Sequence, residues 1–399
     1  MDDKKRNFTV LILSLMVFLA NGDNYASATL ISNIASDLGL SISAASISVT
    51  AYMLGFGIFT LFFGPFGDKY GKVKIVNIAA AGTAIFSILG AVAFNLPSLV
   101  IFRLINGMFG SGIFPVTLAL VGGLFDDKTR HKAIAGVMSM GFLGSATATI
   151  IGGTVSYFAS WRMVYLIYGI GEFVLALIML KTLERDKSTR KNLELTKSYK
   201  VLFSNFKFSR LAALLILIGF AYLGTFTYTG VSIMNKTGFS IFVVGFILAF
   251  YGLGTVFGGK IAPKLKLKMG KSFLIIAGIV GFISLTLLSL TTNPILIILT
   301  IFGFGLSFIS IQSTVVSTLQ AMFPKMRGTV MSIVSFNLFL GASIGTSLNA
   351  KILEVANMNI IYLIASLIIM SIGILSSYFI FNFEKNEIKN QFATARANS

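Results

Sequence analysis

Three ionisable residues lie within stretches of this chain that are otherwise apolar: Asp23, Arg103 and Glu172. If these stretches cross a lipid bilayer, each charge is expensive, because a charged side chain at the bilayer centre costs roughly 2.5–3.5 kcal/mol on insertion scales. Such residues are retained where they bind ions or relay protons. The chemistry open to two carboxyl groups and one guanidinium is therefore the uptake and release of protons.

Asp23 and Arg103 form the most informative pair. At 1.5 Å per helical residue, Arg103 lies roughly 7 Å and Asp23 about 15 Å from the same membrane face, and an arginine side chain spans much of that difference. Burial disfavours a carboxylate and a nearby cation favours it, so a carboxyl that alternates between dry and wet or arginine-paired surroundings changes its proton affinity. Proton coupling requires such a change. The alternative is a structural ion pair between two helices.

Glu172 allows two interpretations. It is either a second protonation site or a neutral carboxyl that is hydrogen-bonded to a neighbouring helix, and the sequence slightly favours the second. The proton-coupling candidates are Asp23, Arg103 and Glu172.

Composition excludes most other chemistry. The chain contains no cysteine and one histidine, His131, expected in a cytoplasmic loop. Thiolate metal sites, disulfides, cysteine nucleophiles and bis-histidine haem sites are thereby excluded, and we expect neither metal nor cofactor. A membrane enzyme would need metal ligands or a nucleophile–base pair. A receptor would usually carry an appended signalling domain, and a channel would show repeated rings of charge. None of these is indicated.

The elements that hold these residues are predicted to be membrane-spanning helices. Of 399 residues, 55% are hydrophobic and 12% are charged, against about 25% charged in soluble domains. A bilayer core about 30 Å thick needs about 20 residues per helical span. The predicted spans are 8–33, 44–65, 74–95, 98–123, 133–158, 162–182, 210–232, 241–260, 272–292, 294–319, 328–351 and 358–381.

The basic residues predict the orientation. With a cytoplasmic N-terminus, 28 of the 32 lysines and arginines fall in cytoplasmic segments, and only Arg162, Lys236 and Lys351 fall outside. Such a bias follows the positive-inside rule, so the net charge of +18 reflects membrane topology and not nucleic-acid binding. The first apolar stretch is too long for a signal peptide. We expect a multi-pass protein of a bacterial plasma membrane with both termini in the cytoplasm.

The chain is predicted to contain two related halves. Phe142–Ala146 recurs as Phe339–Ser343, 197 residues later. At this offset the counterparts of Asp23 and Arg103 would be Phe220 and Thr300, so the second half has no mid-span charge. The fold class is an all-α membrane protein with two pseudo-symmetric six-helix bundles. The predicted divisions are an N-terminal bundle at 1–183, a cytoplasmic linker at 184–209 and a C-terminal bundle at 210–399.

Shorter features refine this division. Gly55 and Gly57 recur as Gly252 and Gly254 at the same offset. The distal linker, 201–208, is either an amphipathic helix on the membrane surface or a plain flexible connection.

A duplicated six-span unit places the substrate site between its halves near the bilayer midplane. Neutral polar and aromatic side chains suit such a site, although many merely join helices. The cavity candidates are Asn24, Tyr25, Asn106, Tyr222, Tyr228, Gln312 and Asn337, with Thr225, Thr227 and Ser307 as further hydroxyls.

The loop between the second and third spans carries a recognisable motif. Gly64–Lys74 reads GPFGDKYGKVK and resembles the G-x-x-x-D-R-x-G-R-K motif of the major facilitator superfamily. The resemblance implies that Asp68, near a helix N-terminus or a basic residue of the other half, is a latch of the cytoplasmic gate. The corresponding loop of the second half, 258–264, lacks the acid. The motif positions are Gly64, Asp68, Lys69, Gly71, Lys72 and Lys74.

Three further elements are similar to the drug:proton antiporter branch of that superfamily. Arg103–Gly107 resembles an R-x-x-x-G motif whose arginine is tied to proton transfer, and Trp161–Tyr165 resembles the W-R-x-x-F opening of the sixth span. The fifth span resembles G-x-x-x-G-P-x-x-G-G, with Ala-Thr in place of Gly-Pro, which weakens the implied bend. These antiporter-type positions are Gly144, Ala148, Thr149, Gly152 and Gly153.

The function expected from these features is proton-driven export of a small amphipathic molecule by alternating access. Alternatives are export of a sugar or nucleoside, and proton-coupled uptake. The expected partners are the substrate, protons and the lipid bilayer, and the chain is expected to act as a monomer.

Overall fold

The computed structural model describes residues 3–125, 127–184, 186 and 195–397, and the regular structure of these residues is helical. Side chains of 382–397 and of a few residues near the gaps, among them His131, lie outside the described part. The helices are α1 (Asp3–Asp37), α2 (Ile42–Tyr70), α3 (Lys72–Ala91), α4 (Leu96–Gly123), α5 (Asp127–Phe158), α6 (Trp161–Thr182), α7 (Leu195–Phe203), α8 (Phe206–Ile218), the π-helical η1 (Gly219–Leu223), α9 (Gly224–Thr237), α10 (Ile241–Met269), α11 (Ser272–Leu290), α12 (Pro294–Met322), the short 3₁₀-helical η2 (Pro324–Met326), α13 (Arg327–Val355) and α14 (Met358–Ala397).

The predicted number of spans is confirmed. Twelve helices of the described chain are long and apolar enough to cross a membrane, and α8, η1 and α9 together form the seventh. Several helices run beyond the predicted boundaries. For example, α10 continues from the predicted end at 260 to Met269, because its lysines extend the helix past the apolar stretch that was used to delimit it.

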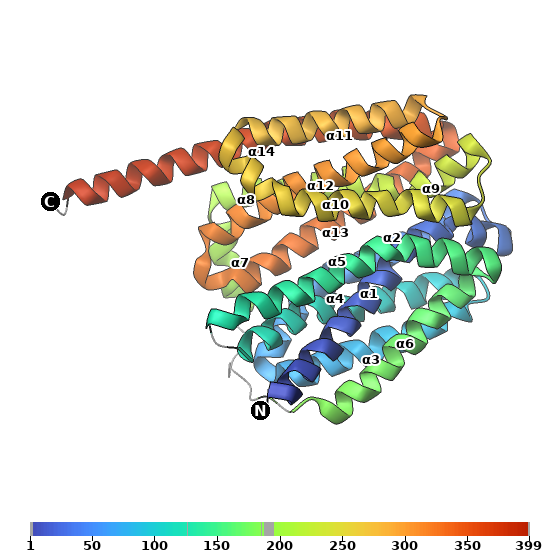
Figure 1. The fold of residues 1–399 in the computed structure, drawn as a ribbon, viewed down its shortest axis with the longest axis horizontal. Helices are drawn as coiled ribbons and strands as arrows, with labels where there is room; N and C mark the ends of the chain where they lie inside the picture. Colours follow the sequence, from blue (N-terminus) through green and yellow to red (C-terminus); the bar gives the residue numbers. More distant parts are fainter. Residues whose placement is uncertain (1–2, 126, 185, 187–194, 398–399) are drawn as a thin grey trace.

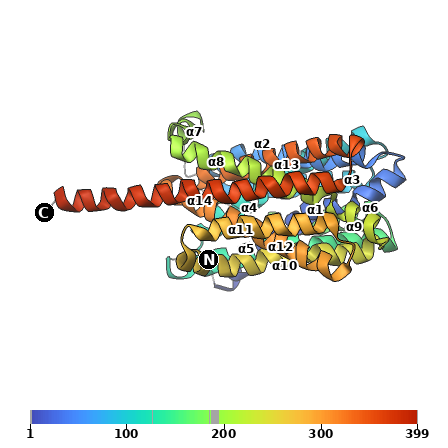
Figure 2. The same ribbon diagram turned by 90° about the horizontal axis from the view of Figure 1, so that it is seen from above.

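The helices form two bundles that lie side by side (Figure 1): α1–α6 in one half and α8–α14 in the other. Both chain ends lie at the same end of the molecule, as an even number of spans requires. We call this the terminus end and the opposite one the far end. Figure 2 shows that α14 continues beyond the other helices at the terminus end.

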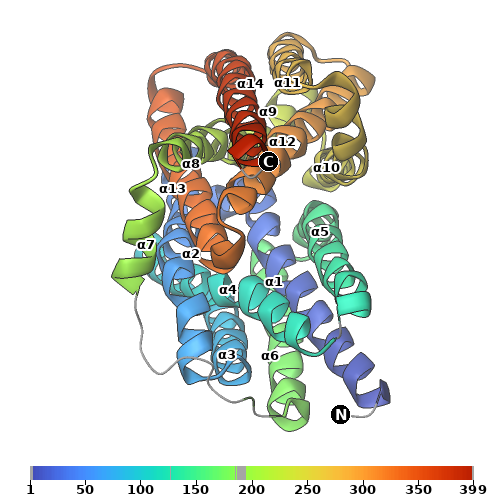
Figure 3. The ribbon, with the colours of Figure 1, turned by 90° about the vertical axis from the view of Figure 1, so that its left-hand side faces the viewer.

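Two seams join the halves. Seen from the terminus end, α13 lies beside α2, and α10 lies near α5 (Figure 3). In the first seam the rings of Phe56 and Phe339 stack with centroids 4.1 Å apart. In the second, a Cβ at Gly252 would lie 2.6 Å from Cα of Ala146, so glycine lets the two backbones approach. The two-bundle fold predicted from the sequence is confirmed.

Glycines make equivalent contacts within each half. A Cβ at Gly107 would overlap the backbone oxygen of Tyr52, and a Cβ at Gly305 would overlap that of Tyr251. The pairs α2–α4 and α10–α12 therefore pack backbone against backbone in the same manner. The internal duplication inferred from short sequence matches thus has a structural counterpart.

This equivalence corrects the residue correspondence. Gly107 and Gly305 make equivalent contacts and lie 198 residues apart. Gly144 contacts Phe18, and Gly341 makes the equivalent contact with Ile216. Corresponding residues in the first span of each half are therefore also 198 residues apart. The counterparts of Asp23 and Arg103 are then Ala221 and Ile301, not Phe220 and Thr300. An offset taken from one matching segment is wrong elsewhere because the halves differ slightly in segment length. The conclusion that the second half lacks this charge pair is unchanged.

The linker contacts the first half through α7. The Tyr199 hydroxyl donates a hydrogen bond to the Leu61 carbonyl oxygen of α2 at 2.7 Å, and burial raises the pKa of Tyr199 to about 12, so the donor proton is retained at neutral pH. For 201–208, where the sequence allowed either a surface helix or a flexible connection, the structure has helix on both sides of a break: α7 ends at Phe203, and Asn205 caps α8 by accepting from the Phe208 amide at 3.1 Å. Residues 185 and 187–194 of the predicted linker lie outside the described residues, and the domain limits remain a prediction.

Candidate functional site

Arg103 is the centre of a buried polar network in the first half. Its side chain is inaccessible to solvent, as is almost all of Asp23. Nη1 donates to Asp23 Oδ1 at 3.0 Å and to Asn106 Oδ1 at 3.1 Å, and Nη2 donates to Ser27 Oγ at 2.6 Å. Although the axial distance estimated from the sequence was about 8 Å, α1 and α4 bring the two charges into direct contact.

Two aromatic rings enclose the guanidinium. Its carbon lies 4.5 Å from the ring centroid of Tyr52 on α2 and 4.6 Å from that of Tyr165 on α6. Cation–π contacts contribute about 2 kcal/mol or more when desolvated. Arg103 thus joins helices α1, α2, α4 and α6. We call Asp23, Ser27, Tyr52, Arg103, Asn106, Tyr165 and Glu172 the charge cluster.

Neighbouring helices fix the positions of these side chains. Asn106 donates to the Thr83 carbonyl oxygen of α3 at 2.9 Å, which orients the amide oxygen that accepts from Arg103. On α1, a Cβ at Gly22 would lie 2.5 Å from the ring of Tyr168. Glycine beside Asp23 therefore allows an aromatic residue of α6 to lie close to the carboxyl.

Glu172 is fully buried near this network, and neither of its oxygens has a hydrogen-bond partner among the described residues. Whether Glu172 is a second protonation site or a neutral carboxyl that joins neighbouring helices remains a prediction. In the same part of the structure, Asp23 Oδ2 and the Tyr168 hydroxyl are also without partners. Such a site has acceptors ready to take a proton.

Replacing Arg103 with Lys tests the pairing directly. Lysine keeps the charge but loses the planar fork that contacts Asp23, Asn106 and Ser27 together. We expect the free energy of unfolding to fall by about 2–4 kcal/mol, since hydrogen bonds to charged groups contribute about 1.5–3 kcal/mol each, and transport to fall at least about tenfold. Thermal unfolding of the purified protein and a transport assay measure both.

The matched control is Arg210→Lys, an exposed arginine that stacks on Phe206 with its guanidinium carbon 4.0 Å from the ring centroid. If Arg103→Lys behaves like Arg210→Lys, the charge cluster has no pairing role.

Two carboxylates, of Asp68 and Asp186, lie at the loop motif. Asp68 pairs with Lys72 in its own loop at 3.6 Å. The N-terminus of α3 is capped instead by Asp186 of the linker, whose carboxylate oxygens accept from the Lys72 and Val73 amides at 2.8 and 2.9 Å. Carboxylates stabilise helix N-termini. Asp186 was not singled out from the sequence, because only the fold brings the linker to this loop.

The remaining motif positions lie around these contacts. Gly64 faces the other half, since a Cβ there would lie 3.7 Å from Ser332 Oγ of α13, and Gly71 adopts a φ of 94° that favours glycine. The Lys69 ammonium lies 5.1 Å from the ring centroid of Tyr70, and Lys74 is exposed on α3. The gating role of the motif, including Asp68, remains a prediction.

The antiporter-type residues of α5 form two stripes of small residues. Gly144 and Gly152 pack against α1, and Ala148 between them is fully buried. Thr149 and Gly153 face α10 of the other half: the Thr149 carbonyl oxygen meets Gly245, and a Cβ at Gly153 would lie 2.6 Å from the Ile241 carbonyl oxygen. The motif therefore lies at a contact within one half and at a seam between the halves.

Replacing Gly153 with Leu is expected to separate α5 from α10 at the far end. Overpacking costs about 1–3 kcal/mol, which in a two-state protein favours the conformation without this contact. Since 1.4 kcal/mol changes an equilibrium tenfold, the conformation with an open far end should become about tenfold more populated. A cysteine introduced at Ser43, which lies at the far end, should then react about tenfold faster with a membrane-impermeant maleimide.

Gly136→Leu is the matched control on the same helix, because a Cβ there meets nothing within 4 Å. Equal labelling rates in the two variants would contradict the proposed role of Gly153.

Hydrogen bonds close the far end of the molecule. Ser43 at the start of α2 donates to Glu354 Oε1 near the end of α13 at 2.8 Å. The Tyr228 hydroxyl of α9 lies 2.7 Å from both Ser46 Oγ of α2 and the Thr346 carbonyl oxygen of α13. We call these five residues the far-end contacts.

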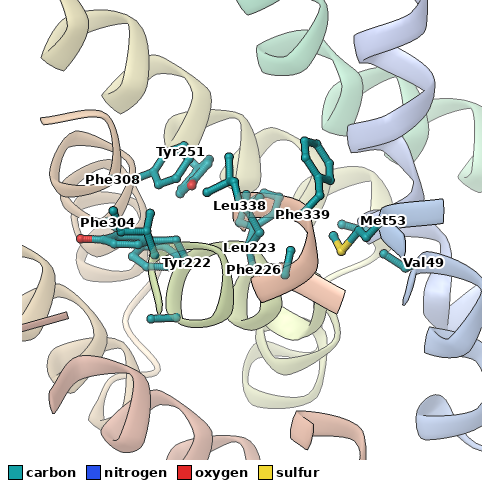
Figure 4. Close-up of a cluster of buried hydrophobic side chains, with 14 of the residues drawn as sticks. Val49, Met53, Tyr222, Leu223, Phe226, Tyr251, Phe304, Phe308, Leu338 and Phe339 are labelled. Carbon is teal, nitrogen blue, oxygen red and sulfur yellow. The ribbon is translucent and has the colours of Figure 1, made fainter. Parts of the chain in front are cut away.

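A small cavity lies between the halves, on the terminus side of those contacts. Its volume is about 20 Å³. Asn24 and Tyr25 of α1 line it from the first half, together with Met53 of α2, and Phe226 and Phe339 line it from the second. Figure 4 shows Met53, Phe226 and Phe339 approaching from α2, α9 and α13. At this volume the cavity has room for about one water molecule, and its lining is apolar and aromatic with a few polar groups.

Of the predicted cavity residues, only Asn24 and Tyr25 line this cavity, although Thr227, noted as a further hydroxyl, does so too. Asn106 belongs to the charge cluster, and Tyr228 to the far-end contacts. Asn337 donates to the Ala212 carbonyl oxygen at 2.8 Å and so joins α13 to α8.

Tyr222 is also a structural residue. It is fully buried within the second half and lies 2.6 Å from Ser307 Oγ, which itself donates to the Ala277 carbonyl oxygen. Gln312 is half-buried on α12. The sequence does not distinguish polar groups that face a cavity from those that join helices, because both occur mid-span.

The second half has aromatic rings where the first has charges. Tyr251, the counterpart of Tyr52, lies 4.5 Å from Phe226 and 5.3 Å from Phe304 between ring centroids. Phe304 stands at the position that corresponds to Asn106. Figure 4 shows this aromatic cluster beside the cavity. The two related bundles therefore have different cores, one with a buried ion pair and one with packed aromatic rings.

Comparison with known proteins identifies relatives. The Major Facilitator Superfamily family model matches residues 13–346. An uncharacterised MFS-type transporter, YceJ of Bacillus subtilis strain 168, is 22% identical over 344 residues, which are 85% of this chain and 87% of that protein.

Other relatives match over part of their length. A triacylglyceride transporter of Mycolicibacterium smegmatis is 30% identical over 44% of this chain and 32% of its own length. The quinolone resistance protein NorB of Staphylococcus aureus is 28% identical over 47% of this chain and 39% of its own length. The chain thus spans about a third of the length of such relatives.

Solved structures share the fold. A bacterial homologue of the human lysosomal transporter Spinster superposes with a TM-score of 0.75 at 15% identity, covering 98% of this chain and 99% of that one. The nucleoside transporter NupG superposes with a TM-score of 0.74 at 17% identity, covering 94% and 99%.

Proposed function

Because the chain belongs to the major facilitator superfamily, we propose that it is a secondary transporter that exports a small amphipathic molecule in exchange for protons. The observation that carries the proposal is the charge cluster. A fully buried Arg103 pairs with Asp23 through one carboxylate oxygen, while the other oxygen and both oxygens of Glu172 lack partners in the described structure.

The cluster offers a means of coupling. With Asp23 ionised, Arg103 holds it by a charge-assisted hydrogen bond. When a proton reaches Asp23, the attraction to Arg103 weakens, and helices α1 and α4, which the pair connects, are less firmly held together. Glu172, near both groups, is positioned to accept the proton next. Protonation thereby changes the packing of the helix that also presents Asn24 and Tyr25 to the cavity.

The two-bundle fold supports a mechanism of alternating access. In the structure the far-end contacts are formed, so the cavity is closed on that side. We place the terminus end in the cytoplasm of a bacterial cell, on the distribution of lysine and arginine. The far end is then the outer surface, and the cycle requires those contacts to break before a proton can enter from outside and substrate can leave.

One proton is sufficient for useful export. At 100 mV, one elementary charge crossing the membrane releases about 2.3 kcal/mol, which corresponds to a roughly fifty-fold gradient at 1.4 kcal/mol per tenfold.

The cavity lining supports an amphipathic substrate. Met53, Phe226 and Phe339 offer apolar contact, and Asn24 and Tyr25 offer hydrogen bonds. The relatives named for quinolone resistance and for triacylglyceride transport are in keeping with such a substrate class.

A susceptibility panel tests the proposal. Cells that express the chain, the Asp23→Asn variant or no transporter are grown with amphipathic antibiotics and dyes. We expect resistance to at least one compound to rise only with the unaltered chain. If no compound distinguishes the strains, export of amphipathic drugs is contradicted.

Proteoliposomes with an imposed pH gradient then give the direction. Export by exchange moves substrate against the proton flux, whereas proton-coupled uptake moves both the same way. Movement with the protons would replace the antiporter by a symporter.

A further inference from the structure

A second cavity lies within the second half, away from the space between the halves. Its volume is about 580 Å³, within the roughly 300–1,000 Å³ typical of small-molecule sites. It lies at the terminus end, among the C-terminal part of α10, the start of α11, the C-terminal third of α12 and residues 377–381 of α14. All its described lining residues belong to the second half, so it is distinct from the cavity between the halves.

Positive charge surrounds this cavity. Lys266 at the end of α10 and Lys271 at the start of α11 line it, and none of its described lining residues is acidic. The segment 260–271 contains five lysines and no acid. Ser313, Ser317 and Ser377 also line it, on α12 and α14. The Ser317 and Ser377 hydroxyls donate to the backbone oxygens of Ser313 and Lys271, so they can offer a ligand only their lone pairs. The ammonium groups recognise phosphate.

An apolar rim accompanies the charge. Leu267 is 88% exposed and Phe381 is 43% exposed, and both line the cavity. The Lys271 ammonium lies 5.5 Å from the centroid of the Phe381 ring. Helix α10 ends at Met269, and after Phe381 the sequence of α14 changes from apolar to largely polar and charged. The cavity therefore opens at the depth where lipid headgroups meet acyl chains.

From these features we infer that this cavity binds the phosphate-bearing headgroup of an anionic membrane lipid. The two lysines hold the phosphate, the serine hydroxyls of α12 and α14 contact the polar headgroup, and an acyl chain leaves along Leu267 and Phe381. Basic pockets between helices on the cytoplasmic side of membrane proteins bind such headgroups. A soluble phosphate compound would gain nothing from the exposed apolar rim, which favours the lipid as the source. This inference does not rest on the proposed transport activity.

Native mass spectrometry of the full chain in detergent measures the site. The probes are phosphatidylglycerol, phosphatidylcholine and glycerol 3-phosphate, each titrated separately. We expect phosphatidylglycerol to bind at one saturable site at least about tenfold more tightly than either of the others. Equal affinity for glycerol 3-phosphate would show a soluble ligand, and equal affinity for phosphatidylcholine would show that charge has no role. Either result overturns the inference.

Charge-matched variants locate the site. The double variant Lys266→Gln with Lys271→Gln should weaken phosphatidylglycerol binding roughly thirty-fold. This loss corresponds to about 2 kcal/mol at 1.4 kcal/mol per tenfold, which is the sum expected for two lysines at about 1 kcal/mol each near an anionic surface. Lys264→Gln with Lys268→Gln removes the same charge from exposed positions of α10 outside the lining and should change binding less than about threefold. Equal losses in the two double variants would indicate diffuse attraction and overturn the inference.

Ser313→Trp provides a test without a change of charge. Serine at this position is half-buried and lines the cavity, so an indole ring would occupy the space of the headgroup. We expect a loss of phosphatidylglycerol binding of at least about tenfold. Unchanged binding in this variant would place the lipid elsewhere.

Discussion

Replacing Asp23 with Asn is expected to abolish substrate accumulation driven by a pH gradient. Asparagine keeps an oxygen that can accept from Arg103 Nη1, now 3.0 Å from Asp23 Oδ1, but it cannot bind or release a proton. In proteoliposomes with a gradient of one pH unit, a one-proton exchanger accumulates substrate up to about tenfold. The variant should reach only equal concentrations on both sides.

A second measurement separates coupling from folding. Removing one partner of a buried ion pair costs about 3–5 kcal/mol, because the other charge is left uncompensated. The double variant Asp23→Asn with Arg103→Gln removes both charges, so its thermal stability should recover while gradient-driven accumulation stays lost. Substrate exchange without a gradient serves as the control for a functional cavity. Accumulation by Asp23→Asn at the level of the unaltered chain would exclude this carboxyl from coupling.

Cross-linking the far end is expected to stop transport completely. The side chains of Ser43 and Glu354 meet at 2.8 Å across the two halves, and the chain has no cysteine of its own. Cysteines at both positions can therefore be joined by a short bifunctional thiol reagent without competing reactions. Alternating access requires these helices to separate, so the cross-linked protein should hold the cavity closed at the far end.

The best control is the same protein after cleavage of the cross-link. With a cleavable reagent, a reductant should restore transport to the level of the untreated double variant, and each single-cysteine variant should be insensitive to the reagent. Transport that continues in fully cross-linked protein would show that the far end need not open. Such a result would contradict the alternating-access mechanism while leaving the assignment of the charge cluster intact.

Hydropathy predicted the twelve spans because lipid imposes one requirement along the whole chain: about 20 apolar residues for each helical crossing. The pairing of Asp23 with Arg103 was also predictable, because two buried opposite charges in one bundle have few alternatives. Asn24 and Tyr25 were identified as a polar and an aromatic residue within the first predicted span. The free-energy cost of placing polar or charged groups in lipid limits where such residues can lie.

Other features depend on contacts that a single sequence does not specify. Phe339 was noticed as part of a repeat, yet its stacking on Phe56 and its place in the cavity depend on how α2 meets α13. Nothing in the sequence distinguishes Asp186 from the other acids of the linker, and only the fold places its carboxylate at the α3 amides. Tyr222 had the right chemistry for a cavity, but it faces the interior of its own bundle.

The π-helical turn η1 offers the seventh span a way to change shape locally. It occupies Gly219–Leu223, immediately before the residues that line the cavity and the far end. Adjacent residues of an α-helix differ by about 100° in direction. Rewinding this wide turn by one residue would therefore swing Phe226 out of the cavity and Tyr228 away from Ser46 together, by rotation about the helix axis. Such a local screw motion would break the Tyr228 contacts of the far end while the hydrogen bond between Ser43 and Glu354 stays formed.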